Sequence, residues 1–133
     1  MKTRKPPLSL AIAGVTATAL LSGCSSAFHY SELSGQRYHL TNLDTQSVII
    51  SRVDGRSTPL RGRVFVEPGL RTIEVQGPPG GSNRSELVTT ELKVKPCTRY
   101  FLVAVKSSRL ATDFDVSVDF EEPIAGCTPP PAA

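Results

Sequence analysis

The sequence predicts an all-β fold, a single small antiparallel β-sandwich of about seven strands. Short runs rich in valine, isoleucine, threonine and aromatic residues alternate with glycine and proline turns, which is typical of an all-β domain. Several runs alternate apolar and polar residues with a period of two, as a half-buried strand requires, and no useful length shows a helical period. We expect strands at Gln36–Thr41, Ser47–Arg52, Arg63–Glu67, Leu70–Gln76, Glu86–Lys95, Thr98–Lys106 and Asp113–Glu121.

The first four expected strands are bounded by turn residues. Gln36–Thr41 alternates weakly, with Tyr38 and Leu40 on one face. The next strand ends at Asp54-Gly55, a pair that favours a tight turn. Pro68-Gly69 joins the third and fourth strands, because proline presets φ and glycine accepts a positive φ. The segment 77–83, GPPGGSN, is too rich in glycine and proline for a strand and is expected to be a loop.

The last three expected strands carry the clearest patterns. Thr98–Lys106 is apolar on both faces, which predicts a central strand. Residues 107–112 should turn this strand into a hairpin with Asp113–Glu121. Alternation along the strands predicts these inward side chains: Val64, Val66, Ile73, Val75, Val88, Thr90, Leu92, Val94, Phe114, Val116, Val118 and Phe120.

Residues 1–23 have the composition of a targeting segment. A basic start is followed by the apolar run Leu8–Leu21, which is shorter than the roughly 20 residues that a membrane span needs. The run ends in Leu21-Ser22-Gly23-Cys24, which resembles the lipobox of bacterial lipoproteins. That resemblance implies cleavage between Gly23 and Cys24, lipidation of Cys24, and stable membrane attachment through several acyl chains. The alternative is an ordinary signal peptide with a chance cysteine.

The expected anchor at Cys24 also sets the segment boundaries and the location of the protein. Residues 24–35 should form a lipidated tether, residues 36–127 the sandwich, and residues 128–133 a disordered proline-rich tail. Ser25 stands where an aspartate would tend to retain a Gram-negative lipoprotein in the inner membrane. We therefore expect the periplasmic face of the outer membrane.

Net charge and cysteine content narrow the possible classes of protein further. The chain has 15 lysines and arginines against 12 acidic residues, and three of the basic ones precede Cys24. The remainder is formally neutral, which argues against nucleic-acid binding. A small exported domain often needs a covalent cross-link for stability. The two remaining cysteines, Cys97 and Cys127, should therefore form a disulfide. A two-cysteine metal site is the alternative, although no further cysteine or histidine lies nearby in the sequence.

Two stretches resemble known families. Val53-Asp54-Gly55, followed by residues 66–75 (VEPGLRTIEV), resembles PEGA-type β-sandwich modules of bacterial surface proteins. Residues 97–104 and 118–127 are similar to small Gram-negative envelope lipoproteins. The resemblance implies an immunoglobulin-like or PEGA-like sandwich and brings with it no catalytic residue.

One histidine, one acidic group and one arginine group are candidate functional sites. His39 would need a serine and a carboxylate beside it for nucleophilic catalysis, and no serine lies in a nucleophile-elbow motif. An acidic group near the C-terminus is compatible with calcium but equally with a solvated strand face; it comprises Asp113, Asp115, Asp119, Glu121 and Glu122. An arginine group suits phosphate or carboxylate ligands but equally edge charges that prevent aggregation, or pairing with the acidic group; it comprises Arg52, Arg56, Arg61, Arg63 and Arg71.

The sequence therefore predicts a non-catalytic, lipid-anchored envelope protein. Its sandwich would bind an envelope protein, a cell-wall polymer or lipid headgroups, or assist assembly, with no cofactor and no metal. The alternatives are an envelope enzyme and a metal-binding module.

Overall fold

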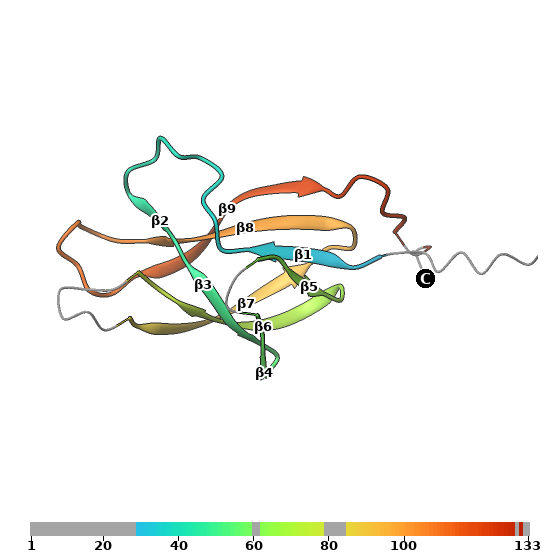
Figure 1. Cartoon of the computed structure of the whole chain (residues 1–133), viewed down its shortest axis with the longest axis horizontal. Coiled ribbons are helices and arrows are strands. Elements are labelled where there is room, and N and C mark those ends of the chain that lie inside the picture. Colours follow the sequence, from blue (N-terminus) through green and yellow to red (C-terminus); the bar gives the residue numbers. More distant parts are fainter. Residues whose placement is uncertain (1–28, 60–61, 79–84, 130, 132–133) are drawn as a thin grey trace, which may run out of the picture.

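The computed structural model describes residues 29–59, 62–78, 85–129 and 131. In these residues the chain forms nine strands and no helix, arranged as two sheets (Figure 1). The all-β prediction is confirmed, and the described part includes no helix long and apolar enough to cross a membrane. The predicted signal peptide and lipidation site, Gly23 and Cys24 included, lie outside the described residues, as do Arg61 and most of the 77–83 loop.

One sheet has five strands and is centred on β8. β9 pairs with the whole of β8 along one edge, while β1 and then β2 pair with successive parts of its other edge, and β5 lies beyond β1. The pairing of β1 with β8 is parallel, so the expectation of a purely antiparallel sandwich is wrong for this sheet. Its strands are β1 (Ser31–Ser34), β2 (Thr45–Ser47), β5 (Val64–Val66), β8 (Thr98–Val105) and β9 (Asp115–Pro123).

The second sheet is antiparallel and has the order β4-β3-β6-β7. Its strands are β3 (Ile49–Val53), β4 (Arg56–Ser57), β6 (Gly69–Gln76) and β7 (Leu87–Val94). Between β3 and β4 the chain turns at Asp54 and Gly55, with φ of 50° and 77°, as the Asp-Gly pair predicts.

Both sheets contribute to one hydrophobic core, which makes the fold a sandwich. The prediction of an inward face is confirmed for β5, β6 and β7, and β8 is central as expected. The phenol oxygen of Tyr100 accepts a hydrogen bond from the Lys95 amide at 2.9 Å, so this large buried side chain leaves no polar atom unsatisfied. The buried core comprises Leu33, Val48, Ile50, Val64, Val66, Ile73, Val75, Val94, Tyr100, Leu102, Ala104 and Phe114.

The N-terminal boundary of the domain differs from the prediction. Residues 31–34 were expected in a tether, but they form the fully buried strand β1. Ser31 Oγ donates to the Lys95 carbonyl and accepts from the Thr98 amide, and the Glu32 carboxylate bonds Arg99. Because these polar side chains find partners, the polar sequence SELS can lie inside the sheet. Gln36–Thr41, expected as a strand, is a loop.

The face of β9 changes part-way along the strand. A β-bulge lies opposite the Phe101–Leu102 step, where Leu102 pairs with Val118 and Phe101 pairs with Phe120, leaving Asp119 as the extra residue. One extra residue reverses the alternation. Phe114 is buried and Val116 packs on the core as predicted, but Phe120 lies on the outer face of the sheet, contrary to the expectation.

The predicted disulfide is present. Cys97 and Cys127 are bonded, with 5.5 Å between their Cα atoms, and the Ile124 amide donates to the Cys97 carbonyl at 2.8 Å. The bond ties the start of β8 to the segment after β9, at the end of the sandwich where β1 begins.

Removing this disulfide should destabilise the domain without changing its fold. The cross-link spans 30 residues, for which loop entropy predicts a loss of roughly 3–4 kcal/mol in the double variant Cys97→Ser/Cys127→Ser. Thermal unfolding followed by far-ultraviolet circular dichroism should show a melting temperature lower by about 10 °C or more. An unchanged melting temperature would contradict the prediction.

Candidate functional site

The loop between β1 and β2 crosses the outer face of the five-stranded sheet. The Tyr38 ring stacks on Phe120, with centroids 3.9 Å apart and planes at 14°, and lies 5.1 Å from the Phe101 ring. Val103 has the same orientation as Phe101 on β8, yet it is 1 % exposed. We attribute its burial to this loop, residues 35–44, which covers the sheet as a second layer.

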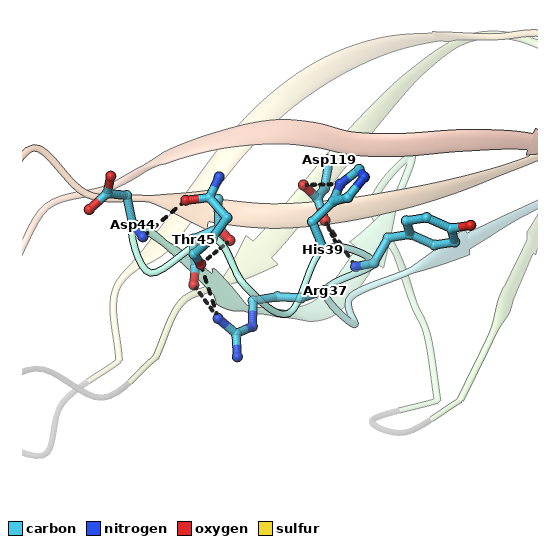
Figure 2. Close-up of polar contacts among 7 residues, drawn as sticks. Arg37, His39, Asp44, Thr45 and Asp119 are labelled. Atoms are coloured by element: carbon cyan, nitrogen blue, oxygen red, sulfur yellow. Dashed lines mark hydrogen bonds and ion pairs between the residues drawn. The ribbon is translucent and has the colours of Figure 1, made fainter.

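One carboxylate fastens the loop to β9. Asp119 Oδ2 accepts hydrogen bonds from the backbone amides of Tyr38 and His39, both at 2.9 Å, and Oδ1 lies 3.2 Å from His39 Nδ1 (Figure 2). Asp119 is the bulged residue, and its side chain lies on the outer face beside Phe120, which the bulge brings to the same face. We call Asp119 with Tyr38 and His39 the latch.

The loop is also braced internally. Arg37 Nη1 donates to the carbonyls of Asn42, at 3.3 Å, and Thr45, at 3.0 Å (Figure 2). The Asn42 side chain accepts from the Asp44 amide at 3.2 Å, and the Thr45 hydroxyl donates to the Asn42 carbonyl. These bonds close the loop on itself, so it meets the sheet in one conformation.

The latch shifts the acidity of its carboxylate. Burial is the largest influence on Asp119 and raises its pKa, but the hydrogen bonds from His39 and Tyr38 together outweigh it. The pKa of Asp119 therefore lies below the ordinary value of 3.8. Each donor favours the charged carboxylate, so the latch is tightest when Asp119 is ionised.

The contact between His39 and Asp119 resembles the histidine–carboxylate pair of a catalytic triad. The Asp119 carboxylate orients the imidazole through Nδ1, as the acid of a triad does, and the His39 side chain is 53 % exposed. Among the described residues no hydroxyl or thiol is hydrogen-bonded to His39 as a nucleophile. The carboxylate that such catalysis would need beside His39 is therefore present, whereas no serine in the described part of the chain is hydrogen-bonded to it.

A row of charges lies beside the latch on the same face. The Arg99 guanidinium donates to Glu32 and to Glu122, both at 2.7 Å, and Arg63 Nε lies 3.6 Å from Glu32. Glu32, Arg99 and Glu122 occupy paired positions on β1, β8 and β9. This row of charges was not predicted, because Glu32 was expected in the tether.

The acidic group does not form one site. Asp119 belongs to the latch, Glu121 pairs with Lys95, and Glu122 pairs with Arg99. Within the described ranges no three histidine, cysteine, aspartate or glutamate side chains are placed to hold a metal ion.

The arginine group is divided as well. Arg52 pairs with Glu74 at 3.4 Å, and Arg71 pairs with Asp54 at 2.9 Å and Glu67 at 3.6 Å. The suggestion that the arginines pair with the acidic group is therefore wrong for Arg52, Arg63 and Arg71. A hydrogen bond from the Thr72 amide, and to a smaller extent one from Arg71, lowers the pKa of Asp54 below its ordinary value. The same two bonds hold the turn between β3 and β4 in place.

A groove of about 680 Å³ opens between the two sheets at their β4 and β5 edges. Its walls are β5 and the β3–β4 hairpin. Arg56, Arg63 and Arg71 line it together with the aromatic residues Tyr30 and Phe65. At the opposite edge the Lys95–Glu121 ion pair links β7 to β9. The groove therefore brings three of the predicted arginines together.

Two further residues of the sequence make packing contacts. His29 stacks on Tyr30, with ring centroids 5.2 Å apart. Gly77, at the start of the glycine-rich loop, lies against Phe114, where an added Cβ would be 2.2 Å from the ring. Close packing of the loop on the core explains a glycine at this position.

Comparison with protein-family models, with curated proteins and with solved structures finds no match for this chain. The class of protein that the structure defines is therefore the architecture alone, a disulfide-linked β-sandwich with a latched outer loop and an arginine-lined groove.

Proposed function

We propose that this chain is a non-catalytic lipoprotein of the cell envelope. Its sandwich is held by Cys24 at the periplasmic face of the outer membrane and works there as a binding or assembly module. The observation that carries the proposal is the sequence Leu21-Ser22-Gly23-Cys24 at the end of an apolar run, seven residues before the first strand of a folded domain.

Because β1 begins soon after Cys24, the lipid anchor would hold the sandwich close to the membrane. Ser31 is the seventh residue after Cys24, and an extended chain of that length spans at most about 25 Å. The end of the sandwich that holds Ser31 would thus stay near the bilayer. The loops 35–44 and 106–114 lie toward the other end (Figure 1).

The disulfide supports an exported location. Disulfides persist in oxidising compartments such as the periplasm and are rare in the cytosol. Cys97 and Cys127 are bonded to each other, which leaves Cys24 as the third cysteine of the chain for lipid attachment.

The turns support an immunoglobulin-like or PEGA-like type of sandwich. Asp54-Gly55 and Pro68-Gly69 both mark tight connections, and Gly69 has a φ of 116°. These are the two features on which the resemblance rests. They concern the fold type and assign no ligand.

An envelope enzyme is the second candidate, because Asp119 orients His39 as in a triad. Hydrolysis of an acyl ester by the purified protein, lost in His39→Ala, would favour the enzyme over the binding module.

The anchor leads to a direct prediction. Cys24→Ser should leave the protein without lipid, and it should be retained as the uncleaved precursor or released into soluble fractions, because serine offers no thiol for the thioether bond. Mass spectrometry of membrane-extracted wild-type protein should find a diacylglycerol on Cys24. A wild-type protein without lipid on Cys24 would rule out the proposal.

The binding role is tested by crosslinking in intact cells, with Cys24→Ser as the control for capture that depends on the membrane. A binding module should yield one or a few crosslinked partners that the unlipidated variant loses. Hydrolytic activity without any such partner would favour the enzyme instead.

A further inference from the structure

The arginine-lined groove lies at the attached end of the sandwich. Tyr30, directly before β1, and Glu67, directly after β5, both line it. The Cys127 sulfur lies 3.8 Å from the Tyr30 carbonyl, so the disulfide marks the same end. Figure 1 shows β1 beginning at the end where the C-terminal segment leaves β9.

A lipid on Cys24 would hold this groove beside the bilayer. Tyr30 is the sixth residue after Cys24, and an extended chain of that length reaches at most about 22 Å. The groove could then move no farther than this from the headgroup layer. This step rests on the proposed anchor.

Two of the groove's arginines retain donors for a ligand. Arg71 is committed, because its guanidinium bonds Asp54 and the carbonyls of Glu67 and Pro68. Arg56 has no ion pair with any described residue. Arg63 is 59 % exposed, and its contact with Glu32 is 3.6 Å, whereas Glu32 already binds Arg99 at 2.7 Å. Guanidinium groups with open donors suit phosphate oxygens.

The remaining lining fits a membrane interface. Tyr30 is 38 % exposed and Phe65 is 60 % exposed, and rings at such positions can enter the boundary between headgroups and acyl chains. Leu70, near the start of β6, is 64 % exposed. The groove's three arginines outnumber its two carboxylates, Asp54 and Glu67, both of which bind Arg71.

We infer that this groove faces the bilayer and that Arg56 and Arg63 bind the phosphate of an anionic phospholipid. The lipid anchor supplies proximity, and the groove fixes the orientation of the sandwich on the membrane. The loops at the other end, including the latch, are then directed away from the bilayer.

The test uses the lipidated protein reconstituted into vesicles. Amide hydrogen exchange is compared between vesicles of phosphatidylcholine and vesicles that also contain phosphatidylglycerol. Exchange in residues 53–58 and 62–67 should be slower with phosphatidylglycerol, and added salt should reduce the difference. In Arg56→Gln/Arg63→Gln the difference should be lost. Unchanged protection of β8 and β9 in this variant shows that the domain remains folded.

The matched control is Arg52→Gln/Arg109→Gln, which removes the same charge outside the groove lining. It should keep the slow exchange that phosphatidylglycerol causes. Equal exchange in both vesicle types, or an equal loss in both double variants, would overturn the inference while leaving the anchor intact. A protein that fails to float with vesicles would instead overturn the anchor, and the inference with it.

Discussion

Leu33→Asp is expected to unfold the domain, whereas Leu40→Asp is expected to leave its stability almost unchanged. Leu33 is completely buried in the core, and Leu40 is 69 % exposed in the loop. A charge at Leu33 loses the packing of the leucine and buries an unpaired ion, with a loss of more than about 4 kcal/mol. That is a large part of the roughly 5–15 kcal/mol by which small domains are stable.

The same substitution at the exposed site should change stability by less than about 0.5 kcal/mol. Urea unfolding of both variants measures the difference, and circular dichroism checks that Leu40→Asp keeps its β-structure. The comparison tests the structure against the sequence-based prediction, because that prediction placed Leu33 in a tether and Leu40 in a strand. Destabilisation by Leu40→Asp alone would support the sequence-based boundaries.

The strands that were predicted correctly can be recognised from the pattern of apolar and polar residues within the strand itself. β7 alternates between exposed and less exposed residues along its whole length and β6 alternates from Thr72 to Gln76, and such a run specifies a strand whatever it packs against. β8 could be recognised as central because both of its faces are apolar. β1 could not be predicted, since its four residues include only one apolar side chain. Its place in the sheet depends on partners such as Arg99 and Lys95, more than 60 residues away.

The candidate site shows the same limit. The Asp-Gly turn and the cysteine pair were predictable because their residue types specify a local conformation or a bond. Asp119, like Asp115, lies between a valine and a phenylalanine, and the bulge is what distinguishes it. A bulge depends on how two strands pair, so no pattern in β9 alone reveals it. For the same reason Phe120 was assigned to the wrong face.

The latch can be tested at its carboxylate. Asp119→Asn keeps the size of the side chain but removes the charge and one of the acceptors that face two backbone amides and the His39 ring. Hydrogen bonds to a charged group contribute about 1.5–3 kcal/mol, so we expect a loss of about 2 kcal/mol in the free energy of unfolding. The Tyr38 and His39 amides should exchange hydrogen faster. Asp115→Asn, at an exposed position on the same strand, is the control and should change neither quantity.

Acid should remove the difference between wild type and Asp119→Asn. The pKa of Asp119 in the folded protein lies below 3.8, the ordinary value that applies to the unfolded chain. The unfolded state therefore binds this proton first as the pH falls, and the stability that Asp119 contributes is complete above about 3.8 and declines through its folded pKa. Urea unfolding at several pH values should show the two proteins converging below pH 4, while Asp115→Asn follows the wild type throughout. A constant difference down to the lowest pH would show that the latch acts through shape and not through the charge of Asp119.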